Sequence, residues 1–192
     1  MHLPNFYISR NEVTVAQYRT CVDARACSEP SSVDDQASCN WNAPGRENHP
    51  VNCVSWDQAK TYVEWLGARL PSEAEWEFTA SSRGEARQFP WGNELPTCDY
   101  AIMQNGNGVN GCGLNTTDAI CSRSPAGDTA DGVCDMAGNV YEWVEDDYHF
   151  NYFGAPCDAY GSLIADCGDI QEGEPIGSAW IDDPRGSRSI SV

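Results

Sequence analysis

The order of apolar and polar residues predicts helices up to residue 84 and little regular structure beyond it. After Ser55, apolar side chains recur at intervals of three and four residues, which places them on one face of a helix. They are Trp56, Ala59, Tyr62, Val63 and Leu66. Gly67 follows directly and is a typical helix stop. The pattern therefore predicts an amphipathic helix between Ser55 and Gly67.

Three helix starts share the signature of a capping box. A hydroxyl residue is followed three positions later by Gln or Glu in the pairs Thr14 and Gln17, Ser55 and Gln58, and Ser72 and Glu75. In a capping box the hydroxyl accepts the N3 amide, and the longer side chain reaches back to the amide of the cap residue. Each pair predicts a helix that begins after its hydroxyl residue, and the helix after Ser72 is expected to be short.

Other stretches are expected to be extended or irregular. Residues 6–8, followed by 11–14, favour a short strand that leads into the first helix. Beyond Gly84 the sequence is rich in Gly, Pro, Asn, Asp and Cys, and its apolar runs are short, at 100–103, 133–136, 139–144 and 179–181. The glycine-rich stretch 105–113 is typical of a surface loop. A half with so little regular structure needs disulfides or a bound cation to offset its chain entropy.

Composition and charge narrow the classes of partner. A chain of 192 residues is expected to form a single domain over 1–192, and we expect a monomer. Its 29 acidic and 11 basic residues give a net charge of -18, which repels phosphate backbones and anionic lipids. This disfavours nucleic acid as a partner and favours cations and basic peptides. The seven Trp and eight Tyr argue for a folded acidic surface rather than a disordered tail.

Ten cysteines indicate disulfide bonds. None lies in a CxxC pair, and His2, His49 and His149 are too far apart for zinc-ligand spacing. Disulfides are typical of an oxidising compartment, so we expect an extracytoplasmic protein, secreted, periplasmic or at the cell surface. The opening MHLPNFYISR does not resemble a signal peptide, and no stretch reaches membrane-spanning length. A leader is therefore expected to lie outside this sequence.

The segment CDMAGNVYEW contains the strongest candidate for a metal site. Asp135 and Glu142 lie seven residues apart, across a bend at Gly138 that lets backbone carbonyls converge with the flanking carboxylates. Hard cations such as calcium take such mixed oxygen ligands. The alternative is that Asp135 caps a turn and Glu142 lies on a solvated strand edge. For nucleophilic or nucleotide chemistry the sequence offers no GxSxG, HExxH or GxxxxGK[ST] motif.

Four stretches in this order resemble the formylglycine-generating enzyme family, also called the sulfatase-modifying factor domain. They are NEVTVAQYRTCV, HPVNCVSWDQAKTYVEWLGARLPSEAEWEFTA, FPWGNELP and SPAGDTADGVCDMAGNVYEW, within about residues 6–148. RLPSEAEWE together with MAGNVYEW is highly specific. The resemblance implies an α+β, C-type-lectin-like fold with low regular secondary structure, stabilised by calcium. Compared with the family, this chain is expected to be truncated at both ends.

The resemblance also implies a function. Active family members oxidise a cysteine of a target protein, such as a sulfatase, to formylglycine. The target cysteine lies in a Cys-x-Pro-x-Arg context, and the reaction uses molecular oxygen and a copper ion held by two cysteines. The copper cysteines follow an Arg-Gly-Gly-Ser motif, whereas this chain ends IDDPRGSRSISV. Cys157 and Cys167 lack the surrounding pattern, so no catalytic residue is assigned. An oxidase is expected only of an intact copper-binding parent. The alternative is a noncatalytic secreted or surface binding module on a calcium- and disulfide-stabilised scaffold.

The resemblance finally implies one calcium site. Its ligands map onto Asp135, Gly138, Val140 and Glu142, with Gly138 and Val140 contributing backbone carbonyls. A second family site needs an Asn where this chain has Ile102, so that site is unassigned. We hypothesise that the additional cysteines brace the region that the second calcium would have held; they are Cys98, Cys112, Cys121 and Cys134.

Overall fold

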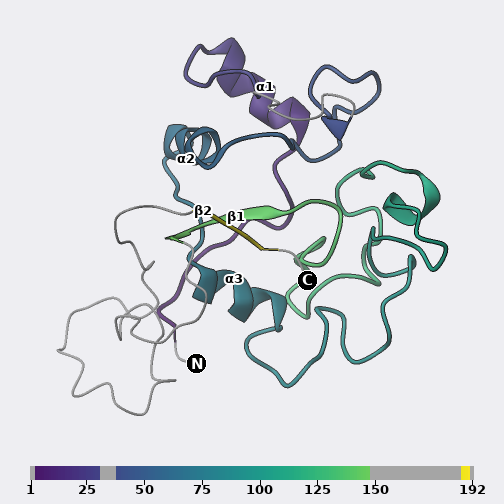
Figure 1. The fold of residues 1–192 in the computed structure, drawn as a ribbon. Helices are drawn as coiled ribbons and strands as arrows, with labels where there is room; N and C mark the ends of the chain where they lie inside the picture. Colours follow the sequence, from purple (N-terminus) through teal and green to yellow (C-terminus); the bar gives the residue numbers. More distant parts are fainter. Residues whose placement is uncertain (1–2, 31–37, 148–186, 191–192) are drawn as a thin grey trace.

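The computed structural model describes residues 3–30, 38–147 and 187–190, and its few regular elements are joined by long irregular segments (Figure 1). The elements in chain order are α1 (Val15–Asp23), α2 (Trp56–Trp65), α3 (Glu73–Ala80), the short 3-10 helix η2 (Gly111–Gly113), β1 (Glu142–Asp147) and β2 (Ser187–Ile190). The expected α+β fold with low regular secondary structure is confirmed.

All three predicted capping boxes are present. Each cap hydroxyl accepts a hydrogen bond from the backbone amide three residues ahead, at 3.1 Å for Thr14 and 3.2 Å for both Ser55 and Ser72. In each box the Gln or Glu side chain in turn accepts a hydrogen bond from the backbone amide of the cap residue. Gly67 follows the end of α2 with a φ of +74°, the left-handed conformation that glycine tolerates best. Local sequence therefore determines where these helices begin and where α2 ends.

The predicted strand at residues 6–8 is wrong, because those residues belong to no strand and pair with no other strand in the described chain. Phe6 instead packs edge-on against Phe78 of α3, with the ring centroids 6.2 Å apart. Of the four apolar runs, the one at 139–144 leads into a strand, β1, whereas 100–103 and 133–136 are irregular. The run at 179–181 lies outside the described residues.

Strand β1 lies between α2 and α3 (Figure 1) and pairs antiparallel with β2, with Glu142 opposite Ile190 and Trp143 opposite Ser189. Two tryptophans hold β1 in place. The indole of Trp56 in α2 donates to the carbonyl of Val144 at 2.8 Å, and the indole of Trp143 donates to the carbonyl of Val54 at 3.0 Å. These contacts hold β1 against α2 and the segment that precedes it.

The apolar interior is divided into two clusters. One joins α3 to β1 and to the segment before it, through Trp76, Ala80, Val133, Met136 and Val144. The other joins α1 to α2 around Tyr18 and Tyr62, whose rings are 5.3 Å apart. The segment 133–144 is thus anchored in the first cluster on both sides of the CDMAGNVYEW turn.

Four disulfides link the described cysteines, in the pairs Cys21–Cys27, Cys39–Cys53, Cys98–Cys112 and Cys121–Cys134. This confirms the use of cysteine for disulfides rather than for metal thiolates in the described residues; Cys157 and Cys167 lie outside them. Disulfides are characteristic of proteins that fold in oxidising surroundings. None of the described helices is long and apolar enough to cross a membrane.

Candidate metal centre

The turn in CDMAGNVYEW bends sharply through three residues with positive φ. They are Asp135 at +58°, Gly138 at +90° and Asn139 at +59°. Gly138 is required by its surroundings as well, because a Cβ there would lie 2.4 Å from the carbonyl oxygen of Ile102. The amide of Asn139 donates to that same carbonyl at 2.8 Å. The turn is therefore held tightly against Ile102.

Asp135 lies at the start of this turn, beside the Cys121–Cys134 disulfide. Its carboxylate accepts a hydrogen bond from the backbone amide of Cys121. Burial raises the pKa of Asp135, since the ionised form is the one that loses hydration. This bond joins Asp135 to an amide 14 positions earlier in the sequence and holds the carboxylate in a partly buried position.

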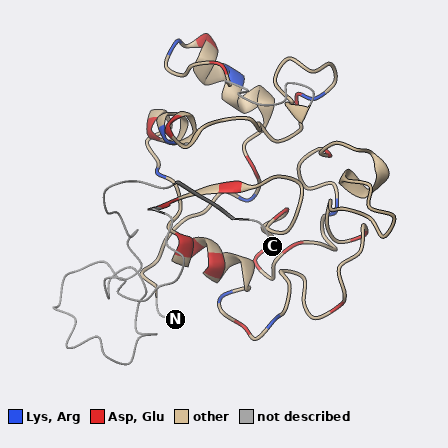
Figure 2. Ribbon diagram, in the orientation of Figure 1, with Lys and Arg blue, Asp and Glu red and all other residues tan. Residues whose placement is uncertain are grey.

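Glu142 is the first residue of β1, and its carboxylate turns inward rather than into solvent. One carboxylate oxygen accepts the indole N–H of Trp76 in α3 at 2.6 Å. Burial, reinforced by the negative charge of Asp135, raises the pKa of Glu142 to about 7. The alternative that Glu142 lies on a solvated strand edge is therefore wrong. Acidic positions are otherwise spread along α3 and β1 (Figure 2).

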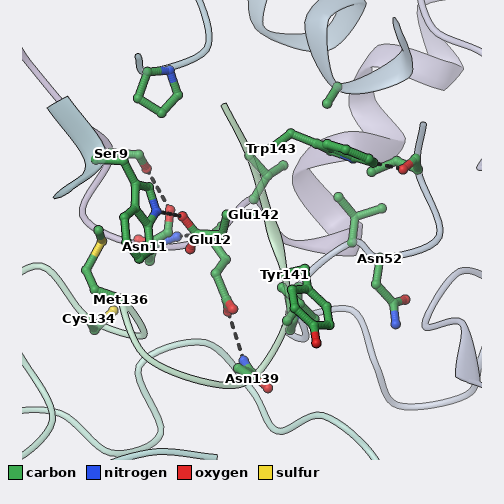
Figure 3. Close-up of a pocket in the computed structure, with 18 of the residues that line it drawn as sticks. Ser9, Asn11, Glu12, Asn52, Cys134, Met136, Asn139, Tyr141, Glu142 and Trp143 are labelled. Carbon is green, nitrogen blue, oxygen red and sulfur yellow. Dashed lines mark hydrogen bonds between the residues drawn. The ribbon is translucent and has the colours of Figure 1, made fainter. Parts of the chain in front are cut away.

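A third carboxylate, not identified from the sequence, joins these two. Glu12 precedes α1, is only 8% exposed, and accepts the side-chain amide of Asn139 at 2.8 Å through Oε2 (Figure 3). Burial and the charges of Asp135 and Glu142 raise its pKa well above the ordinary value. In the sequence, Glu12 lies in the NEVT stretch that contributes to the family resemblance. Spacing along the chain does not predict its contact with Asn139, which is 127 positions away.

These side chains form an electrostatically strained acidic group that suits a hard cation. Buried carboxylates that raise one another's pKa are stabilised by an opposing charge. In the described residues, one trio of His, Cys, Asp or Glu has all its ligand atoms within 4.8 Å, namely Cys121, Cys134 and Asp135. Its sulfurs are joined in a disulfide, so only the Asp135 carboxylate remains as a ligand there. The donors left at the turn are oxygens, and the carboxylates of Glu12, Asp135 and Glu142 do not themselves form such a trio among the described residues.

The region around Ile102, where the family's second calcium site would lie, is crosslinked by a disulfide and by side-chain hydrogen bonds. The Cys98–Cys112 disulfide spans this region, and its Cys112 sulfur lies 3.3 Å from the Ala101 carbonyl oxygen. The guanidinium of Arg123 donates to the Cys98 carbonyl at 2.6 Å and to the Asp118 carboxylate at 3.2 Å. The four additional cysteines form two disulfides, Cys98–Cys112 and Cys121–Cys134, and their bracing role stays a hypothesis.

The copper ligands implied by the resemblance do not fit the described residues. A copper pair needs two thiolates, because thiolate rather than a disulfide is the metal ligand. All eight cysteines of the described ranges are consumed in disulfides. No copper-dependent step is derived from these residues.

A cleft of about 1400 Å³ lies over the turn (Figure 3). Its walls come from the N-terminal segment before α1, from α2, and from the turn and the start of β1. Three of its lining side chains are large, apolar in body and strongly exposed, namely Tyr7, Leu66 and Tyr141. Exposed aromatic and aliphatic groups around a concave surface are typical of ligand-binding sites.

The raised pKa of Glu142 predicts a specific pH dependence in the presence of a chelator. Since this pKa is higher in the folded chain than the ordinary 4.5, the folded state binds more protons between the two values. Stability is therefore full below the ordinary pKa and is lost as the pH rises through about 7. We expect urea unfolding in EGTA to show a loss of about 3 kcal/mol between pH 5 and pH 8.

The control for this measurement is Glu142→Gln, which removes this titrating group and should reduce the loss of stability between pH 5 and pH 8. Glu12 and Asp135, whose pKa values are also raised, act in the same direction. Glu75 and Asp131, whose pKa values are lowered, contribute at more acidic pH. A wild-type stability that rises from pH 5 to pH 8 would contradict the inward placement of Glu142.

Comparison with known proteins identifies what this chain resembles. A family model described as the sulfatase-modifying factor enzyme 1-like domain matches residues 1–187. The match extends beyond the stretch 6–148 on which the sequence motifs were recognised.

Two curated relatives and one solved structure show the extent of the similarity. The formylglycine-generating enzyme of Mus musculus is 36% identical over 121 residues, covering 56% of this chain and 32% of its own length. The serine/threonine-protein kinase pkn1 of Chlamydia pneumoniae is 39% identical over 110 residues, covering 57% of this chain and 16% of its own. The structure of PvdO from Pseudomonas aeruginosa superposes with a TM-score of 0.66 and 29% identity, over 91% of this chain and 62% of that one. The chain thus spans less than half the length of the curated relatives named.

Proposed function

The chain belongs to the sulfatase-modifying factor family, and on that premise we propose that the full-length protein is an oxidase that converts a cysteine of a target polypeptide to formylglycine. In this proposal the described residues provide the scaffold and the cleft that binds the target. The relatives named as formylglycine-generating enzymes support this reaction class. The copper-binding cysteines have to come from residues other than the eight described ones.

The observation that carries the proposal is the cleft over the CDMAGNVYEW turn. A polypeptide substrate needs an elongated apolar surface that a small metabolite does not, and the cleft offers Tyr7, Leu66 and Tyr141 for that purpose. The net charge of -18 favours a target segment with a basic residue, such as the Arg of Cys-x-Pro-x-Arg. A sulfatase is the target that the family resemblance implies.

We also propose that the scaffold binds one calcium ion at the turn. Asp135 and Glu142 would supply carboxylate oxygens, and Gly138 and Val140 would supply backbone carbonyls. When bound, the ion would provide structural crosslinking and no redox chemistry. The strained acidic group described above supports this assignment, because a divalent cation offsets its repulsion.

A second candidate function is a noncatalytic binding module, secreted or attached to a surface. The observation that favours it is the complete pairing of the described cysteines, which leaves a rigid crosslinked scaffold without thiolates. One relative is named as a serine/threonine-protein kinase, so similarity to this domain does not by itself indicate formylglycine formation. Both candidates are expected outside the cytoplasm, in agreement with the four disulfides of the described residues.

One assay separates the two candidates. The full-length protein, supplied with copper, calcium and oxygen, is mixed with a peptide containing Cys-x-Pro-x-Arg, and any aldehyde is captured with a hydrazide probe. We expect an aldehyde on this peptide and none on a matched peptide with Ser in place of Cys. Peptide binding without aldehyde would favour the binding module. Absence of both binding and aldehyde would contradict the target-binding cleft itself.

A further inference from the structure

The glycine-rich loop 105–113 contains three Asn-Gly dipeptides, which begin at Asn105, Asn107 and Asn110. In such a dipeptide the backbone nitrogen of the glycine can attack the side-chain carbonyl carbon of the asparagine, because glycine has no Cβ that hinders the approach. The five-membered imide that forms is then hydrolysed to aspartate or isoaspartate. This chemistry needs only water, so the structure around each asparagine decides which of the three reacts first.

Asn105 is held in place by hydrogen bonds within the loop. Its side-chain oxygen accepts the backbone amides of Asn107 and Val109, each at 3.0 Å. Its own backbone amide donates to the Val109 carbonyl at 2.8 Å. Attack by the nitrogen of Gly106 requires the carboxamide to turn, which breaks both of the bonds that its oxygen accepts. The loop therefore protects Asn105.

Asn110 is protected through the backbone on either side of its peptide bond to Gly111. The carbonyl oxygen of Asn110 accepts the amides of Gly113 and Asn115, at 3.1 and 3.0 Å. Gly111 is buried, and a Cβ there would lie 1.9 Å from the carbonyl oxygen of Thr116. The peptide is thus packed directly against another stretch of backbone. Ring closure requires this peptide to rotate, and the packing opposes the rotation.

Asn107 has neither form of protection. It is exposed, and within the described part of the chain its carboxamide makes no hydrogen bond. A Cβ added at Gly106 or at Gly108 would meet no atom within 4 Å apart from its chain neighbours, so the space around this turn is open. One bond must open to free the attacking nitrogen, from the Gly108 amide to the Asn105 carbonyl at 2.9 Å. Exposed turns of this kind open locally at a small cost in free energy.

We propose that Asn107 is a site of spontaneous covalent modification, at which the backbone nitrogen of Gly108 displaces ammonia from the side-chain amide. A bond forms between this nitrogen and Cγ of Asn107, the bond from Cγ to Nδ2 breaks, and the amide proton of Gly108 leaves with the ammonia. Water then adds to either carbonyl of the imide and opens the ring to aspartate or isoaspartate. Nothing is oxidised or reduced. The inference is independent of the proposed oxidase activity.

The modification changes the charge and the backbone of a loop that borders the cleft, whose lining includes Gln104 and Asn110. Either product adds a negative charge, and isoaspartate also adds a methylene to the main chain. The base of the loop is fixed by the Cys98–Cys112 disulfide and by the bond from the Cys112 amide to the Met103 carbonyl at 2.7 Å. We therefore expect the loop to rearrange locally while the fold is retained.

Peptide mapping by mass spectrometry tests this inference on the oxidised, full-length protein after incubation at mildly alkaline pH. Digestion at acidic pH avoids further conversion during the mapping. We expect Asn107 to convert on the order of 10-fold faster than Asn105, because two hydrogen bonds to the Asn105 carboxamide must break first. Equal rates at the three sites, or a fastest rate at Asn105 or Asn110, would overturn the inference.

The matched control is the same protein reduced and unfolded in guanidinium chloride. There the three asparagines should convert at similar rates, since each precedes a glycine and none is held by the fold. A preference for Asn107 that persists unchanged in the unfolded chain would show that local sequence, and not the loop structure, sets the order. That result would overturn the structural argument.

The variant Asn107→Gln tests the assignment by a second measurement. It keeps a carboxamide at this position, but attack by the next nitrogen would have to close a larger ring, which is much slower. We expect the more acidic species that accumulates in the wild type on ion-exchange chromatography to be largely lost in this variant, with an unchanged near-UV spectrum. Accumulation at the wild-type rate would place the modification at another residue.

Discussion

Reduction of the disulfides is expected to unfold this chain. Three of the four bonds close loops of 13 or 14 positions, and a loop of this size stabilises a fold by about 3 kcal/mol through restriction of the unfolded chain. Three such contributions approach the whole stability of an ordinary domain, about 5–15 kcal/mol. Since the described part of the chain has only three α-helices and two short strands, little else compensates.

Near-UV circular dichroism and tryptophan fluorescence, recorded with and without dithiothreitol, would follow this loss. Removing single bonds by paired Cys→Ser substitution refines the test. The pair Cys121 and Cys134 should cost more stability than the pair Cys21 and Cys27, whose loop is only 6 positions long, and should also weaken calcium binding beside Asp135. A reduced chain that retains its native near-UV spectrum would show that the helices and their two cores suffice.

Calcium is expected to raise the midpoint of thermal unfolding of the oxidised chain by about 5–10 °C. A ligand present at 100 times its dissociation constant stabilises the folded state by about 2.7 kcal/mol. For a chain of this length each kcal/mol shifts the midpoint by about 2–4 °C. Asp135→Ala should remove the shift, because it deletes a carboxylate that the folded chain holds next to the turn.

Asp99→Ala provides the matched control, since it removes an exposed aspartate from an irregular segment outside the turn. Its calcium-induced shift should equal that of the wild type. An undiminished shift in Asp135→Ala would place the calcium elsewhere. An equal shift with magnesium would argue against a site with the high coordination number that calcium prefers.

Helix starts were predictable because capping is local. The hydroxyl of Ser72 and the carboxylate of Glu75 are three residues apart, and both of their bonds to the cap form within one turn of chain. The same holds for Gly67, whose positive φ depends only on the geometry of the helix end. In contrast, the strand expected at residues 6–8 failed because a strand requires a partner, and hydrophobic pattern alone does not say whether a partner exists.

The candidate site shows the same division. The sequence, through its family resemblance, placed Asp135 and Glu142 at one turn. It did not reveal Glu12, because the contact between Glu12 and Asn139 joins residues 127 positions apart. It also left Glu142 open to two interpretations, and only the packing of Trp76 against it shows that the carboxylate faces inward.

The sequence by itself determined the family, the helix caps, the dependence on disulfides and the oxygen-rich turn. Each of these can be recognised from residue types and from short motifs along the chain. The tertiary structure alone decided which cysteines pair, where Glu12 lies, and that three carboxylates of different segments share one interior. These last features arise from burial and charge between distant segments. Their energies depend on which groups exclude water together, and that is not determined until the chain has folded.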